Sequence, residues 1–152
     1  MKYYVLTLTI IALLLSGSRA VLAQSITVTA LPPVSLTITT AVAGSNPTSV
    51  SNGVSRYTLV TKKNAGFTRI TARIPTNMPA NTTLWVTLVS PGGTIVSAGT
   101  IALSTTAQVV LSGLPNTTTT FAATALTYTF DATPLGGVIG SSTRVVTFAF
   151  AP

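Results

Sequence analysis

Apolar and polar residues alternate with a period of two along most of the chain after residue 24. Ile26, Val28 and Ala30 share one face of the first such stretch, with threonines between them. This period is typical of a β-strand that buries one face. The pattern predicts ten short strands, at residues 25–30, 34–40, 56–60, 66–74, 83–90, 94–97, 100–104, 107–112, 125–132 and 143–151.

Segments rich in glycine, proline and asparagine separate these strands. The Gly92-Gly93 pair predicts a tight hairpin between two of them, because two-residue hairpin turns need positive φ angles. Many short strands with frequent turns indicate an all-β domain. The length favours a single antiparallel β-sandwich of about seven to nine strands.

The alternation also assigns a hydrophobic inner face to the predicted sandwich. Its residues are Tyr57, Leu59, Ile70, Ala72, Ile74, Leu84, Val86, Leu88, Leu126, Tyr128, Phe130, Val146, Phe148 and Phe150. A face of this size predicts a core large enough for independent stability.

The first 23 residues have the pattern of a secretory signal peptide. Lys2 precedes an apolar run at residues 5–15, and small residues stand at Val21 and Ala23. The run has 11 residues, whereas a membrane-spanning helix needs roughly 20. We therefore expect cleavage after Ala23, a domain at residues 24–152 without a transmembrane segment, and a secreted or cell-surface location.

The composition excludes most enzyme chemistry. The chain has no histidine, no cysteine and a single carboxylic side chain, Asp131. Acid–base catalysis near neutral pH, paired-carboxylate hydrolysis and transition-metal binding all require residues that are missing. No glycine-rich phosphate motif and no specific nucleic-acid motif occurs either. The sequence predicts a protein that is not an enzyme and needs no cofactor and no metal.

Two structural roles are open for Asp131. It precedes Thr133-Pro134 closely, so its carboxylate is expected to accept hydrogen bonds from the backbone of a turn. The alternative is a salt bridge to Arg144 on the following strand.

Five of the six basic residues after residue 23 lie close together, at Arg56, Lys62, Lys63, Arg69 and Arg73. If strands 56–60 and 66–74 pair as a hairpin, these residues form one outward basic face. That face would attract an anionic polymer such as lipopolysaccharide, acidic polysaccharide or extracellular DNA. The competing interpretation is a charged surface that serves solubility and edge protection.

Trp85 lies on the strand face opposite Leu84 and Val86. An exposed indole there could stack on a sugar, whereas a partly buried one would pack under a loop.

The leading segment at residues 24–31 is a candidate for strand exchange. Ile26, Val28 and Ala30 form its apolar face, and Leu31-Pro32-Pro33 separates it from the rest of the domain. Proline ends a hydrogen-bonded ladder. The strand can therefore pair within its own domain or add to the edge of a second copy, which would produce an open filament.

Three stretches carry a resemblance to a known group of proteins: ITVTA, YTLVTKKNAGFTRITARI, and the end LTYTFDATP with STRVVTFAF. Together with the signal peptide they resemble secreted bacterial β-sandwich proteins of the spore-coat-U and fimbrial-subunit type. The resemblance implies an immunoglobulin-like sandwich and a function in surface fibres or coats.

The leading hypothesis is thus a non-enzymatic, exported structural or adhesive component of the cell surface or extracellular matrix, such as a fibre or coat subunit. One alternative is a monomeric secreted module that binds a glycan or anionic polymer through the basic face or Trp85. Another is an eight-stranded outer-membrane β-barrel, which the length and the aromatic last strand suggest. The chain has few aromatic residues for the two girdles of such a barrel.

Overall fold

The computed structural model describes residues 24–29, 34–38, 45–136 and 143–152. These residues form ten strands and one short 3-10 turn, η1 (Pro134–Gly136). The strands are β1 (Ser25–Thr29), β2 (Val50–Asn52), β3 (Arg56–Thr61), β4 (Arg69–Arg73), β5 (Thr82–Leu88), β6 (Val96–Ser97), β7 (Thr100–Ala102), β8 (Gln108–Ser112), β9 (Thr119–Ala132) and β10 (Thr147–Ala151). The all-β prediction is confirmed.

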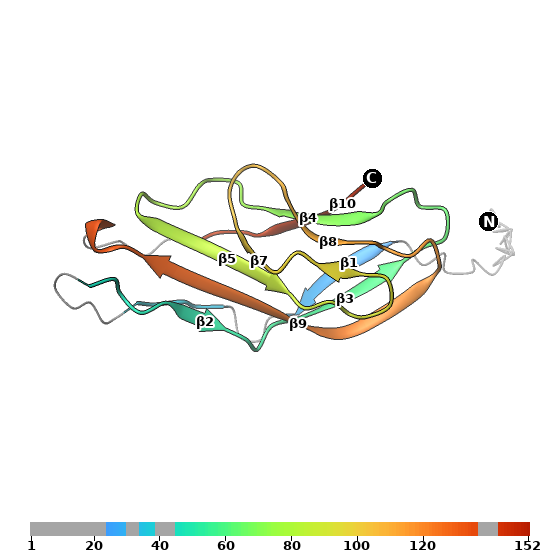
Figure 1. Ribbon diagram of the computed structural model, residues 1–152, viewed down its shortest axis with the longest axis horizontal. Helices are drawn as coiled ribbons and strands as arrows, with labels where there is room; N and C mark the ends of the chain where they lie inside the picture. Colours follow the sequence, from blue (N-terminus) through green and yellow to red (C-terminus); the bar gives the residue numbers. More distant parts are fainter. Residues whose placement is uncertain (1–23, 30–33, 39–44, 137–142) are drawn as a thin grey trace, which may run out of the picture.

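The strands form two antiparallel sheets that pack as a sandwich (Figure 1). One sheet has the order β1-β3-β9-β5-β7, with β2 also paired to β9. The other has the order β10-β4-β8-β6. The described residues thus contain ten strands in two sheets, where about seven to nine strands are expected. Within the described ranges, no helix could cross a lipid bilayer.

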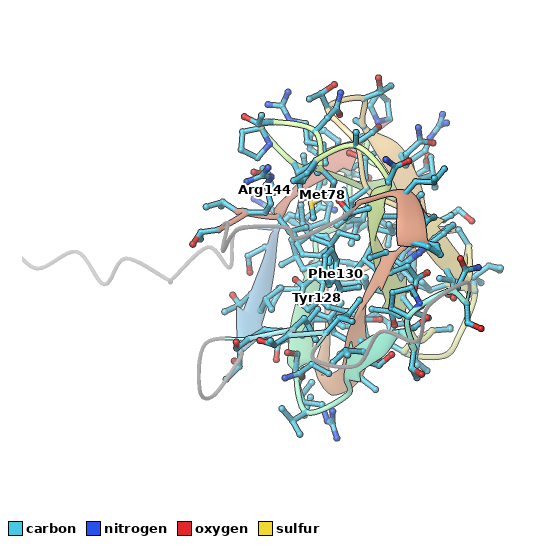
Figure 2. The ribbon with its side chains drawn as sticks, turned by 90° about the vertical axis from the view of Figure 1, so that its left-hand side faces the viewer. Met78, Tyr128, Phe130 and Arg144 are labelled. Carbon is cyan, nitrogen blue, oxygen red and sulfur yellow. The ribbon has the colours of Figure 1, made fainter. Side chains whose placement is uncertain are left out.

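The core lies between the sheets and contains most of the predicted inner face. Tyr57, Leu59, Ile70 and Leu126 are completely buried, and burial of one large apolar side chain stabilises a fold by about 1.5–3 kcal/mol. Figure 2 looks along the sandwich and shows Tyr128 and Phe130 of β9 between the layers. Further core residues, which the alternation did not assign, are Ile95, Leu103, Val110, Leu111 and Leu114.

β9 is the longest strand, with 14 residues, and it organises its sheet. Its first half pairs with β3, and its second half lies between β2 and β5. At the change of partner, Ala123 has a φ of 52° and the β3–β9 register shifts. Such a bulge bends a strand, so β9 can pair with β3 along its first half and with β2 and β5 along its second half.

Two strand predictions are wrong. The predicted strand at 34–40 forms no ladder over its described part, 34–38, although Val34 and Leu36 pack against the core. Alternation reports which side of an extended chain is buried, and this does not require a paired neighbour. Conversely, β2 lies between the predicted strands 34–40 and 56–60, where the alternation predicts no strand.

The predicted Gly92-Gly93 hairpin is also wrong. Both glycines have positive φ, at 100° and 65°, but β5 and β6 belong to different sheets. The turn therefore carries the chain from one layer to the other. Positive φ angles permit many tight turns, and only tertiary packing decides whether the flanking strands pair.

Candidate functional site

Trp85 stands on the outer face of the first sheet, among small side chains. Strand register places it in one row with Ser51, Thr129 and Ala102, on β2, β9 and β7. Its neighbours Leu84 and Val86 point into the core side, as the alternation requires. Trp85 is partly buried, which is the second of the two states that the sequence left open.

The lone carboxylate of the chain holds this indole. Trp85 Nε1 donates a hydrogen bond to Asp131 Oδ2 at 2.6 Å. Both predicted roles of Asp131 are therefore wrong: Arg144 instead donates to the carbonyls of Asn77 and Thr143. Alternation places Trp85 and Asp131 on the outer face, but only the register between β5 and β9 brings them together.

An open hollow of about 330 Å³ lies beside this pair. Its lining consists of Ser49, Trp85, Thr100, Thr129 and Asp131. Around it, neighbouring hydroxyls are bonded in pairs, Ser51 with Thr129 at 2.8 Å and Thr87 with Thr100 at 2.9 Å. The volume is at the lower end of the roughly 300–1,000 Å³ range of small-molecule sites.

The lining is suited to binding rather than to chemistry. Asp131 is the only acidic or basic side chain among the described lining residues, so the lining offers no second group for proton transfer. A Ca²⁺ ion takes about six to eight oxygen ligands, and one of the two carboxylate oxygens already accepts the indole N–H. The residues present therefore do not fit a metal site.

The basic residues do not form one face. β3 and β4 are in different sheets, so the hairpin that would gather Arg56, Lys62, Lys63, Arg69 and Arg73 does not form. β4 pairs with β10 and β8 instead. The reason lies in the connection at residues 62–68, where Asn64 and Gly66 have positive φ and the chain crosses between layers.

Two of these cations are also bound to carbonyl groups of the backbone. Arg56 Nη1 donates to the carbonyls of Gly53 and Ser55, at 2.9 and 2.8 Å. Arg69 Nε donates to the Pro152 carbonyl at 2.6 Å. Lys63 and Arg73 are exposed at the surface. Binding of a polyanion by this set stays a prediction, but it would have to use separate positions on both layers.

The leading strand pairs within its own domain. β1 is antiparallel to β3, with Ile26 opposite Leu59 and Val28 opposite Tyr57. Ile26 and Val28 pack against the core and are only partly buried. The third predicted exchange residue, Ala30, lies outside the described residues.

The first and last strands, β1 and β10, form one side of the sandwich, which we call the β1/β10 flank. Each is an edge strand with one paired neighbour in the described sheets. Four inward residues of this flank, Ile26, Val28, Phe148 and Phe150, are partly exposed. One strand further in, Leu59 and Ile70 are completely buried.

The two tyrosines of the core have altered acidity. Burial raises the pKa of Tyr57 and of Tyr128 to about 12. The Tyr57 side chain begins on β3, and its hydroxyl donates to the Val89 carbonyl just after β5. The Tyr57 side chain thus extends beneath β9 towards the end of β5, away from the β1/β10 flank.

No protein-family model matches this sequence, and comparison with curated proteins and with solved structures finds no significant match.

Proposed function

We propose that the protein is a non-enzymatic, exported structural or adhesive component of a cell surface or extracellular matrix, which assembles through its β1/β10 flank. Residues 1–23 would serve as the signal peptide. The assembled form would be a fibre or coat of the kind that the resemblance to spore-coat-U and fimbrial subunits implies.

The observation that carries this proposal is the position of β1. It is bonded to β3 alone among the described strands, so it could leave the domain without breaking another ladder. The vacated edge of β3 could then pair with β1 of a second copy. If each copy passes its β1 to the next and the arrangement does not close into a dimer or ring, the exchange continues into a filament.

The edge strands of this flank carry no charge to oppose such pairing. Neither β1 (SITVT) nor β10 (TFAFA) contains a charged residue. Natural edge strands often carry lysine, proline or a bulge that blocks association. Uncharged edges beside partly exposed apolar residues are typical of a surface that has a partner.

The test uses residues 24–152 and a variant that lacks residues 24–31. We expect the intact protein to form filaments as its concentration rises, measured by sedimentation and negative-stain microscopy. The deletion variant should remain unassembled. A synthetic peptide of residues 24–31 should bind to it, because the peptide restores the ladder on β3.

The matched control is the same peptide with Ile26→Ser and Val28→Ser, which keeps the backbone but loses the apolar contacts. It should bind much more weakly. The proposal is wrong if intact protein stays monomeric at every concentration and the deletion variant is an unfolded monomer, since β1 would then belong only to its own core.

A further inference from the structure

We infer that the hollow beside Trp85 is a binding site for an uncharged saccharide. This ligand site lies on the outer face of β2, β9, β5 and β7, which are neighbours in one layer (Figure 1). It goes beyond the proposed structural role, because it needs only one copy of the chain.

The first step concerns the fixed orientation of the indole. A partly exposed tryptophan can donate its N–H to water, so no carboxylate is needed to satisfy it. Here the only acid of the chain accepts that N–H at 2.6 Å. A charge-assisted bond is stronger than a neutral one, so it holds the ring in one orientation before any ligand arrives, which lowers the cost of binding.

The second step concerns the groups around the ring. Ser49, Thr100 and Thr129 line the same hollow, and each hydroxyl can both donate and accept. Asp131 adds a carboxylate that accepts only. The hollow therefore combines one apolar ring with several hydrogen-bonding groups on rigid strands, as small-molecule sites typically do.

The third step is the choice of ligand class. An anionic ligand would meet the Asp131 carboxylate, and the described lining includes no lysine or arginine to compensate. A purely apolar ligand would shield the hydroxyls from water. Thr100 and Thr129 would keep one partner each, in Thr87 and Ser51, but a hydroxyl left unsatisfied costs about 1–3 kcal/mol. A cationic ligand would be repelled at long range, because residues 24–152 carry six basic side chains and one acidic one, a formal charge of +5.

A neutral saccharide suits the indole ring and the hydroxyl groups of the hollow. The C–H face of a pyranose ring packs on the indole, which is a large apolar surface. Its hydroxyls can exchange hydrogen bonds with the threonines and serine, while Asp131 keeps its bond to the indole N–H. The open shape of the hollow admits one part of a longer glycan chain.

The experiment uses the fact that the chain contains a single tryptophan, so intrinsic fluorescence reports on this site alone. Residues 24–152, at a concentration where sedimentation shows no assembly, are titrated with maltohexaose, cellohexaose and N-acetylchitohexaose. We expect a saturable change in emission at millimolar concentrations of at least one of them. Spermine and heparin serve as the cationic and anionic comparisons.

Variants then locate the binding. Asp131→Asn keeps an acceptor for the indole but removes the charge, and it should weaken saccharide binding about tenfold, which corresponds to roughly 1.4 kcal/mol. Trp85→Phe lacks the fluorophore, so its binding is measured by how far saccharide-containing gels slow its migration. This variant should migrate without retardation. Thr147→Val changes an exposed threonine of the other sheet and should bind like the unchanged protein.

The inference is overturned if none of the three saccharides changes the emission saturably, or if Asp131→Asn binds as well as Thr147→Val while both remain folded. A response to spermine or heparin that exceeds every saccharide response also overturns it. None of these results bears on filament formation, which is measured separately.

Discussion

The two flanks of the sandwich are closed in different ways. On one side β6 and β7 belong to different sheets and are joined by only two residues, Ala98 and Gly99. The Ser97 hydroxyl donates to the Leu88 carbonyl of β5. The inward residue of β7, Ile101, is partly buried, and Leu103, just after the strand, is only 5% exposed. On the β1/β10 flank, the edges are the first and last strands, and their inward residues remain partly exposed.

The difference indicates that one flank is finished within the chain and the other is not. A short crossing ties the two layers together. Two strands that reach the edge from distant parts of the sequence leave a seam, which a second chain can cover. Four predictions test this contrast, in order of decreasing expected effect.

The largest effect is expected from truncation of a core side chain on the closed flank. Leu103→Ala should lower the free energy of unfolding by about 2–5 kcal/mol, because it leaves a cavity in a packed site. Ile26→Ala on the β1/β10 flank should cost at most about 1.5 kcal/mol, since part of that side chain already contacts water. Urea unfolding of both variants measures the difference, and equal losses would remove the contrast between the flanks.

The second prediction concerns a glycine beside the closed flank. Gly113 has a φ of +72°, and a Cβ there would lie 2.3 Å from the Thr94 carbonyl oxygen. Gly113→Ala should therefore destabilise the fold by about 2–4 kcal/mol, from the clash together with the unfavourable φ.

The matched control is Gly99→Ala in the crossing between β6 and β7. Gly99 has a similar φ of +78°, but a Cβ at this position would meet nothing within 4 Å. The variant should lose only about 1 kcal/mol, which is the cost of the left-handed backbone alone. A similar loss in both variants would show that the Thr94 contact relaxes without cost.

The sequence could predict the strands of both flanks but not their assignment to sheets. Nine of the ten observed strands overlap a predicted one, because burial on one face imposes alternation. The three residues of β2 are too few to show a period, and the threonine-rich start of β9 resembles a loop. Which strands pair depends on contacts between distant residues, so the β3–β4 and β5–β6 hairpins were predicted where the chain changes layers.

The same limit applies to the candidate site. Alternation correctly places Trp85 on the outer face of its strand, and no local signal links it to a carboxylate 46 residues away. The Trp85–Asp131 pair arises because Thr83 lies opposite Asp131 and Trp85 opposite Thr129, so the two side chains are diagonal neighbours. Register of this kind is a tertiary property.

The third prediction uses the two tyrosines, which are the only ones after residue 23. Their pKa values of about 12 exceed the ordinary value of 10.0 because burial favours the neutral form. Stability should thus be unaffected by these groups below pH 10 and should fall as the pH rises from 10 to about 12, where the unfolded chain loses these protons first.

Deletion of residues 24–31 should leave both tyrosine pKa values raised, because the Tyr57 hydroxyl is bonded to the Val89 carbonyl on the far side of β9. Titration followed by tyrosinate absorbance measures this directly. If both tyrosines of the deletion variant titrate near pH 10, the leading strand cannot detach without loss of the core, and exchange is excluded.

The smallest effect on stability, and the sharpest on assembly, is expected from a single charge on an edge strand. Ala149 of β10 is exposed and points outward, so Ala149→Lys should change the free energy of unfolding by less than about 0.5 kcal/mol. A lysine on an edge opposes the approach of another strand, because pairing would bury its charge.

Val96→Lys places the same charge on β6, at the other edge of the same sheet, where Val96 is 60% exposed. If the β1/β10 flank is the unfinished one, Ala149→Lys should raise the concentration needed for filaments in a sedimentation assay, and Val96→Lys should leave it unchanged. If Val96→Lys raises that concentration and Ala149→Lys does not, the assembly surface lies on the β6/β7 side. The partly exposed residues of β1 and β10 would then be residues at the edge of the core with no role in assembly.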